Sequence, residues 1–386
     1  MKPIPNPKYQ ALKMIFKTGC RWQLLLCTCY LLLQGNTVFA QWRKYANEFL
    51  NIGAGARGLA MGSAQAATAG DATAAYWNPA GLSAVQEAPQ AALMHAEYFG
   101  QIGNYDFAAV ALPTTSGKRT LALTALRFGV DDIPNTLFLV EPDGTINYNN
   151  IRSFSSADYA FLVSMGQTLW EEDGNSLRFG FNTKVIHRTV GSFAKAWGFG
   201  LDAGLQYTHQ RWRLGLVARD LTTTVNMWRF QFTEEEKEAL YLAQNDIPVK
   251  STEQTAPRLV AGIAHLFPLG RKMELLAEAN ADLMFDGTRN TLLRGHTLSL
   301  DPKLGLELNI NKVVYLRGGI NNFQQALADD DFVNQKKVWI YQPSVGAGFR
   351  IQNFSIDYAF SSLANQSSPL YSHIFSLHYA FAKKAS

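Results

Sequence analysis

The sequence predicts an all-β transmembrane fold, an antiparallel outer-membrane β-barrel of about fourteen strands with an N-terminal hatch segment in the lumen. Three observations predict it. Beyond Ala88, large apolar residues alternate with small or polar ones, as in Phe354-Ser355-Ile356-Asp357, which is the period of a strand with two different faces. These segments run roughly nine to thirteen residues, near the length that crosses a bilayer at a tilt. Short connections alternate with long ones, as at the two rims of outer-membrane barrels.

Residues 1–40 have the pattern of a secretory signal peptide for export by the Sec pathway. A basic region without acids precedes an apolar run from Trp22 to Leu33, and Val38-Phe39-Ala40 forms a small-residue cleavage site. The alternative is a transmembrane anchor, which is disfavoured because the apolar run is too short to span and no basic flank follows it. Initiation at Met14 would shorten only the basic region.

Removal of this segment changes the charge and the thiol content. It takes five of the 35 basic residues and none of the 31 acidic ones, so the remaining net charge is near −1 and gives no reason to expect a nucleic-acid partner. Cys20, Cys27 and Cys29 leave with it, and the mature chain then has neither a disulfide framework nor a cysteine-bound metal. We expect no cofactor.

Residues 41–88 are predicted to be the hatch. The stretch from Asn51 to Ser83 is crowded with Gly and Ala and carries two charges, Arg57 and Asp71. It is too small-sided to form a core and too apolar to be a solvated linker, so it fits a compact segment whose backbone lies close to neighbouring backbone. Asn and Pro open turns and Gly relieves their strain, so Asn78-Pro79-Ala80-Gly81 is expected to turn the chain out of the hatch into the first strand.

Residues 89–386 are predicted to form the barrel. A soluble two-sheet sandwich has the same period, but the strand lengths and the aromatic residues at strand ends favour the membrane. The expected strands are 90–99, 104–112, 118–129, 154–166, 176–188, 196–208, 211–219, 256–267, 272–283, 297–310, 312–320, 342–351, 353–361 and 370–381. The side chains expected to face the lumen include Lys184, Asp202, Arg213, Arg219, Glu274, Glu278, Asp282, Lys303, Glu307 and Asp357.

The long extracellular loops are expected at 130–153, 220–255, 284–296 and 321–341. In the second of these, Thr233 and Glu236 have the spacing of a helix capping box. This helix is interpreted either as a contact for a partner or as a solvated lid. In the last loop, Asp329-Asp330-Asp331 has oxygen ligands for Ca²⁺, although a solvated acidic loop is the favoured interpretation. The candidate partner-binding residues are Trp228, Phe230, Phe232, Tyr241 and Phe332.

The sequence carries no strong catalytic motif. Gly53-Ala54-Gly55-Ala56-Arg57-Gly58 matches the dinucleotide fingerprint, but no buried strand precedes it, no alternating helix–strand pattern follows it, and Asp71 comes too early for the ribose contact. The seven histidines are scattered, and neither a zinc-protease motif, a nucleophile elbow nor a phosphate-binding loop is present. The chain is therefore interpreted as a non-enzymatic protein without a metal site.

A signal peptide, a Gly/Ala-rich segment ending in Asn-Pro-Ala-Gly-Leu and about fourteen strands together resemble the FadL-like outer-membrane barrels. Within that group, the residues from Phe49 to Gly62 and from Asp71 to Leu82 resemble the PorV/PorQ family of the Bacteroidota. The hatch-motif residues that carry the resemblance are Gly53, Gly55, Arg57, Gly58, Gly62, Asp71, Asn78, Pro79 and Gly81.

This resemblance implies a role in the type IX secretion system. Loops of such an outer-membrane barrel would bind the C-terminal domain of secreted cargo, the translocon or proteins of the attachment complex, with lipid or lipopolysaccharide around the barrel. The sequence does not distinguish a PorV-like from a PorQ-like protein. The alternative is a FadL-like transporter of long-chain fatty acids or other hydrophobic molecules, and a barrel that only supports a larger complex is the third interpretation.

Overall fold

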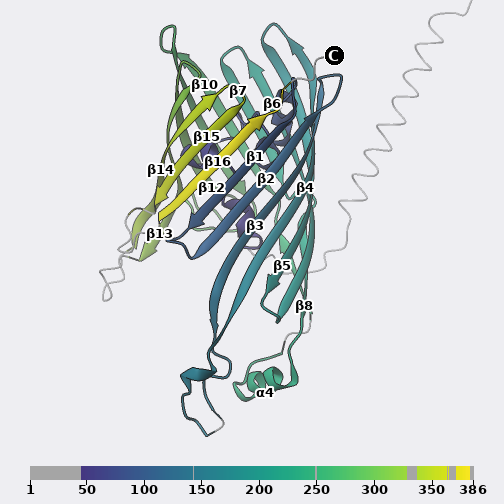
Figure 1. Cartoon of the computed structure of the whole chain (residues 1–386), viewed down its shortest axis with the longest axis vertical. Coiled ribbons are helices and arrows are strands. Elements are labelled where there is room, and N and C mark those ends of the chain that lie inside the picture. Colours follow the sequence, from purple (N-terminus) through teal and green to yellow (C-terminus); the bar gives the residue numbers. More distant parts are fainter. Residues whose placement is uncertain are drawn as a thin grey trace, which may run out of the picture. The chain divides into compact units, whose positions relative to one another are not determined.

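The computed structural model describes residues 45–382, apart from 142, 248–249, 328–336, 363 and 365–370. The expected signal peptide over 1–40, the acidic run 329–331 and Phe332 lie outside the described residues. Sixteen strands are present in the described part of the chain, and they form one continuous antiparallel sheet (Figure 1).

The strands are β1 (Gln90–Tyr98), β2 (Gly103–Pro113), β3 (Arg119–Asn135), β4 (Arg152–Glu172), β5 (Asn175–Val190), β6 (Ala194–His209), β7 (Trp212–Arg219), β8 (Thr224–Phe230), β9 (Lys250–Thr255), β10 (Arg258–Pro268), β11 (Met273–Met284), β12 (Ser299–Ile310), β13 (Val314–Leu327), β14 (Lys337–Ile351), β15 (Phe354–Ser362) and β16 (Tyr371–Ala380). The helices are η1 (Glu48–Asn51), α2 (Ala56–Ala60), α3 (Ala74–Trp77), η2 (Pro79–Ala84), η3 (Tyr148–Asn150) and α4 (Glu234–Leu242).

The sheet closes on itself. The first strand pairs with the last, from Gln90 opposite Ala380 to Glu97 opposite His373, and β5 pairs with β6. The closed ring contains fourteen strands, β1–β7 and β10–β16, and every neighbouring pair is antiparallel. Closure removes the unpaired strand edges that a membrane does not tolerate. The predicted fourteen-stranded barrel is confirmed.

The prediction of one long loop over 220–255 is wrong at both ends. β8 continues the direction of β7 and pairs with β6, while β9 pairs with β8 and leads into β10. The two long strands are interrupted at residues 220–223 and 256–257, and Asp220 and Thr223 adopt positive φ there. This interruption breaks the period of two, which is why the sequence pattern ends at Arg219. The connection itself covers only residues 231–249.

Two of the other long connections are also shorter than expected at the ends that the structure describes, and the third is shifted by one or two residues. β3 runs on to Asn135 and β4 begins at Arg152, so the connection covers 136–151 rather than 130–153. The β11–β12 connection covers 285–298, and β13 extends to Leu327 before the undescribed part of the last loop. Short turns join the strands at the opposite rim, for example at Gln210 and Gln352, both in the left-handed conformation. The long-loop rim and the short-turn rim are therefore distinct, as in outer-membrane barrels.

The two faces of the wall differ as the alternation predicts. Leu93, Leu123 and Leu306 are about half exposed on the outer face, whereas Lys184 and Glu307 are buried on the inner face. Asp202, Glu278, Asp282 and Asp357, from the set expected in the lumen, are also buried. An apolar exterior around a polar interior is the arrangement of a membrane barrel and the reverse of a soluble sandwich.

The helices of the described part are short, and none is long and apolar enough to cross a membrane. α4 begins with the predicted capping box: Glu236 N donates to Thr233 Oγ1 at 3.2 Å and Thr233 N donates to Glu236 Oε2 at 2.8 Å. No residue of α4 is buried, so the helix stands clear of the wall at the long-loop rim (Figure 1).

Cysteine labelling tests the orientation of the two rims. In a protein whose three native cysteines are replaced by serine, we expect Tyr241→Cys on α4 to react with a membrane-impermeant maleimide on intact cells. Gln352→Cys, in a short turn, should react only after the outer membrane is permeabilised. Labelling of Gln352→Cys but not Tyr241→Cys on intact cells would show that the barrel has the opposite orientation in the membrane.

Candidate functional site

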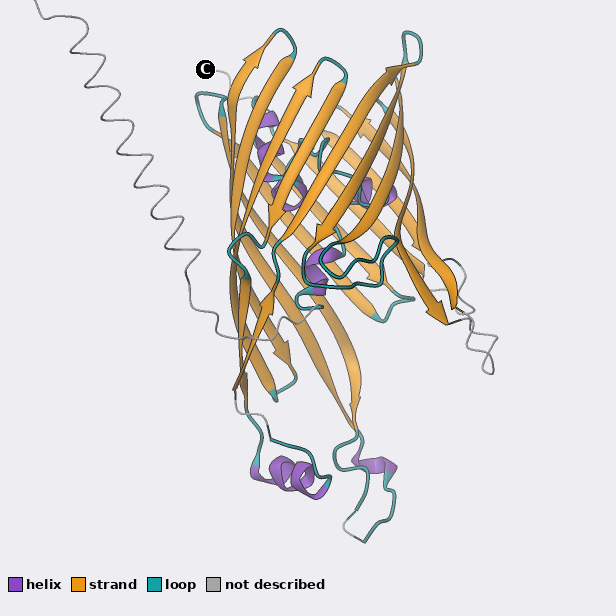
Figure 2. Cartoon of the chain, turned by 180° about the vertical axis from the view of Figure 1, so that it is seen from behind, coloured by secondary structure: helices purple, strands orange, loops and turns teal. Residues whose placement is uncertain are grey.

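The candidate site is the region where residues 45–88, here called the inner segment, meet the inside of the ring. α2 packs against β13–β16, and α3 and η2 pack against β3 and β4, with η2 also on β5 and β6. Figure 2 shows these small helices within the ring of strands. The inner segment therefore contacts both halves of the wall.

The glycines of the Gly/Ala-rich motif allow tight turns of the inner segment. Gly53, Gly55 and Gly62 have φ values of +120°, +80° and +60°, which disfavour other residues. A side chain on Gly62 would meet the backbone nitrogen of Ile320 at 2.6 Å, so the two main chains are in direct contact. Gly58 lies under the ring of Trp77, whose Nε1 donates to Ala54 O at 2.7 Å.

Asn78 and Pro79 join the inner segment to the wall. Asn78 Oδ1 accepts a hydrogen bond from Ala80 N at 3.1 Å and so begins η2. Its Nδ2 donates to Ala66 O at 2.7 Å and to Leu205 O, on β6, at 3.0 Å. One amide thus holds the helix start, the inner segment and a wall strand together.

Asp71 and Gly81 shape the turns around α3. Asp71 Oδ1 accepts from Thr73 N at 2.8 Å and from Thr73 Oγ1 at 2.6 Å. Burial alone would raise the pKa of Asp71, but His378, Arg57 and the Thr73 hydrogen bonds hold it below its usual range. A side chain on Gly81 would overlap the carbonyl of Ala69. Both residues therefore have a structural role in these turns.

Arg57 is the main ionic link between the inner segment and the wall. Its guanidinium binds Glu307 with two bonds, Nε to Oε2 at 2.8 Å and Nη2 to Oε1 at 3.1 Å. Arg317 Nε lies 2.7 Å from the same carboxylate, and Arg317 Nη1 lies 2.6 Å from Asp357 Oδ1. Burial alone would lower the pKa of Arg57, but Glu307 holds it above its ordinary value. The network crosses β12, β13 and β15.

Wall glycines let the inner segment approach the strands closely. At each position an added side chain would run into the inner segment: Gly180 against Pro79, Gly215 against Ala66, and Gly319 against Met61 and Gly62. We call the full set the glycine belt, and its members are Gly166, Gly180, Gly204, Gly215, Gly262, Gly305, Gly319 and Gly346. They come from eight strands, and at Gly166, Gly180, Gly215, Gly305 and Gly319 the wall backbone meets the backbone of the inner segment.

Polar wall side chains pair with the main chain of the inner segment. Glu278 accepts from Ala67 N at 2.8 Å and from the Thr68 hydroxyl. Further bonds run from Ala56 N to Ser376 Oγ (2.7 Å), from Asn182 Nδ2 to Ala75 O (2.7 Å), from Gln206 Nε2 to Ala69 O (2.9 Å) and from Thr120 Oγ1 to Val85 O (2.7 Å). These bonds satisfy backbone groups that short helices leave unpaired.

The lining of β1 and β2 is different. Their buried inward side chains are apolar or aromatic: Ala92, Met94, Ala96, Tyr98, Tyr105, Phe107, Ala109 and Ala111. Phe49 is part of the same cluster, and Leu50, Ile52 and Phe128 pack against it. The buried Tyr105 hydroxyl has no hydrogen-bond partner among the described residues. This side of the lumen therefore holds the inner segment mainly through apolar contact.

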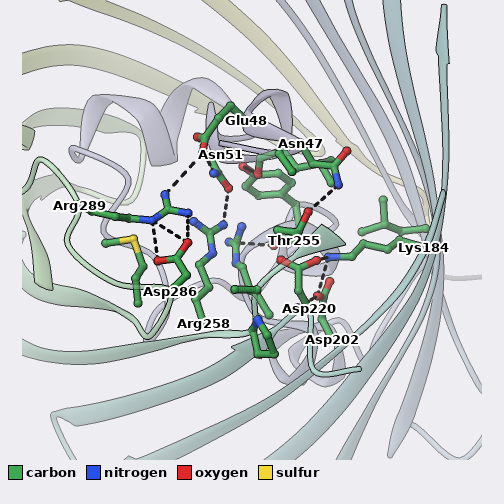
Figure 3. Close-up of a pocket in the computed structure, with 18 residues that line it drawn as sticks. Asn47, Glu48, Asn51, Lys184, Asp202, Asp220, Thr255, Arg258, Asp286 and Arg289 are labelled. Carbon is green, nitrogen blue, oxygen red and sulfur yellow. Dashed lines mark hydrogen bonds and ion pairs between the residues drawn. The ribbon is translucent and has the colours of Figure 1, made fainter. Parts of the chain in front are cut away.

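Two polar cavities border the inner segment. The smaller, about 40 Å³, lies between η1 and the strand interruption (Figure 3). There Lys184 Nζ lies 2.8 Å from Asp202 and 2.6 Å from Asp220, and Arg289 lies 2.7 Å from Asp286 and 3.6 Å from Glu48. The larger, about 660 Å³, lies beside the Arg57 network. Paired charges line the smaller cavity and hold η1 to the wall.

The predicted partner-binding residues do not form one site. Trp228 and Phe230 belong to β8 rather than to a loop, and Trp228 Nε1 donates inward to Glu253 Oε2 at 3.1 Å. Phe232 stacks on Phe193 with ring centres 6.1 Å apart. Tyr241 on α4 is 77% exposed, which leaves it as the one of these four that is free for a partner. Within the described residues, no group of three or more His, Cys, Asp or Glu is placed to hold a metal ion.

Comparison with known proteins identifies the fold. No protein-family model and no curated protein matches the chain. Among solved structures, the monoaromatic hydrocarbon channel CymD (13% identity, TM-score 0.53) covers 86% of this chain and 98% of its own. The Pseudomonas putida toluene transporter TodX (13%, 0.54) covers 85% and 98%. A Pseudomonas aeruginosa FadL homologue (14%, 0.47) also covers 85% and 98%.

The chain has the fold of a FadL-like outer-membrane barrel. This fold agrees with a location in the outer membrane. CymD and TodX are named as a channel and a transporter. The resemblance to the PorV/PorQ family gains no support from these comparisons and stays a prediction.

Adjacent glycines on β13 test the glycine belt. Gly319→Ala adds a methyl group that meets the main chain at Met61 and Gly62, whereas the nearest atom to the same methyl at Gly318 is 4.0 Å away. We expect Gly319→Ala to cost about 1–3 kcal/mol from overpacking and to make the inner segment more sensitive to protease. Gly318→Ala is the matched control. Equal thermal unfolding of the two variants would contradict direct backbone contact.

Proposed function

We propose that this protein passes small hydrophobic molecules across the outer membrane, along the apolar side of its lumen. The observation that carries the proposal is the inner lining of β1 and β2, whose buried side chains are alanine, methionine or aromatic, in a barrel whose other lumen-facing positions include many charged residues. A hydrophobic solute in contact with these strands would displace apolar contacts rather than hydrogen bonds. Such an exchange costs little, because both partners are apolar.

The inner segment leaves room for this route because its hydrogen bonds and ion pairs are mainly with strands other than β1 and β2. Arg57, Asn78 and the glycine belt bind it to strands from β4 to β14. On β1, the contact includes Gly55 N at 3.0 Å from the Met94 sulfur, a weak acceptor. Passage along β1 and β2 would therefore need side-chain movement but no removal of the inner segment. The names of CymD and TodX are in line with small aromatic hydrocarbons as cargo.

Neighbouring alanines on β2 provide the test. Ala109 faces the lumen at 3% exposure, whereas Ala108 faces outward. We expect Ala109→Phe to slow the uptake of radiolabelled toluene by about tenfold, because overpacking of about 1–3 kcal/mol adds to the barrier. Ala108→Phe should leave uptake unchanged, and Phe107→Ala, which widens the lining, should not reduce it.

The assay compares a deletion strain with strains that express each variant, with oleate as a second probe. Folding of each variant is checked by its altered gel mobility without heating. If deletion changes the uptake of neither toluene nor oleate, the transport proposal is wrong.

A second candidate is a partner-binding role in type IX secretion. One observation favours it: Tyr241 and Leu242 on α4 are 77% and 69% exposed, at the tip of a wall that β8 and β9 extend. Two adjacent exposed apolar side chains on a helix offer a small docking surface.

Affinity purification from native membranes tests this second role. We expect recovery of a translocon, cargo or attachment protein with the wild type. Recovery should be reduced with Tyr241→Lys/Leu242→Lys and unchanged with Glu235→Lys/Glu238→Lys on the same helix. Equal recovery with both double variants would exclude α4 as the contact.

A further inference from the structure

Three cations stand side by side on the outer face of the long-loop rim. Lys195 on β6 is directly opposite Arg229 on β8, and Arg229 is directly opposite Lys250 on β9. All three side chains are exposed. We call Lys195, Arg229 and Lys250 the cation row.

Within the described part of the chain, the cation row has no acidic partner, since no carboxylate there forms an ion pair with any of the three. Like charges that are directly opposite on neighbouring strands destabilise a sheet. On the inner face nearby the charges are paired, since Arg188 on β5 binds Asp158 on β4 at 2.8 Å and Glu253 on β9 at 3.3 Å. The unpaired row is therefore an exception within this part of the wall.

The row lies next to exposed apolar side chains on the outer face of the wall. Two residues further along the outer face of β6 is Trp197, which is 55% exposed, and Phe199 follows with 52% exposed. On β8 the corresponding neighbour of Arg229 is Met227, which is 61% exposed. The order apolar, tryptophan, cation is the order of bilayer core, interface and headgroup region.

A cavity of about 590 Å³ joins these groups. It is lined by the cation row together with Phe193, Trp197 and Met227. Its apolar lining residues can contact an acyl chain, and its three basic residues present positive charge to an anion. Neither feature serves the lumen, because the cavity is on the opposite face of the wall.

We propose that the cation row binds the phosphorylated headgroup of an outer-leaflet lipid of the lipid A class, with an acyl chain against Trp197 and Met227. Phosphate neutralises the mutual repulsion of the three cations, and the apolar lining matches the chain that such a lipid carries. The proposal is independent of what crosses the lumen. Soluble phosphate would satisfy the charges but not the apolar lining, so the lipid is the occupant that fits both.

The test measures binding of diphosphorylated lipid A to the full-length protein in detergent by native mass spectrometry. We expect Lys195→Gln/Arg229→Gln/Lys250→Gln to lose on the order of 100-fold in affinity, because each basic residue near an anionic surface contributes about fivefold or more. The matched control is Lys118→Gln/Lys272→Gln/Lys312→Gln, which removes the same charge from exposed turns of the opposite rim. The control should bind as the wild type does.

Two further readouts distinguish a lipid site from a nonspecific effect of charge. Lipid A should raise the melting temperature of the wild type but not of the cation-row variant, while without lipid this variant should be at least as stable as the wild type, since repulsion is removed. Wild-type binding to dephosphorylated lipid A should be much weaker.

Three outcomes would overturn the proposal. The first is equal loss in the control triple variant, and the second is equal binding of dephosphorylated lipid. The third is a cation-row variant that keeps lipid A but loses binding to an acidic polypeptide such as polyglutamate, which would assign the row to a protein partner.

Discussion

The contact between the main chain of the inner segment and the main chain of the wall is the constraint on which the rest of the structure depends. A segment made of one-turn helices leaves most of its N–H and C=O groups without internal partners, and a buried backbone group without a partner is costly. Two kinds of residue in the wall help to provide partners for these backbone groups. Glycines such as Gly215 and Gly319 allow approach, and side chains such as Glu278 and Gln206 supply partners.

Several charges in the lumen are held in pairs close to the inner segment. Glu307 is held by Arg57 and Arg317, and Asp202 is held by Lys184. A buried ion pair is stable only if its remaining hydrogen-bonding groups are satisfied as well. Here Asp202 also accepts from Asp220 N at 2.8 Å, so its two roles, charge partner and backbone acceptor, fix the strand interruption in place.

The sequence predicted those features that depend on local pattern. The period of two gives the strands and their inward faces, and the capping box of Thr233 gives α4, because both signals lie within a few residues. It did not predict β8 and β9, since the positive φ at Asp220 and Thr223 breaks the period. Nor did it predict the glycine belt. Gly204, Gly215 and Gly305 are spaced as ordinary strand residues, and their common role depends on the register of eight strands, which no short window contains.

The two sides of the lumen hold the inner segment by different kinds of contact, polar on one side and apolar on the other. Hydrogen bonds and ion pairs depend on direction and distance, so Arg57 and Asn78 hold the inner segment in one position against β6 and β12. Apolar contacts with β1 and β2 are non-directional, and a different apolar group can replace them at small cost. The inner segment is therefore held least rigidly where Phe107 and Ala109 line the wall, and under the proposed function this is where a solute would pass.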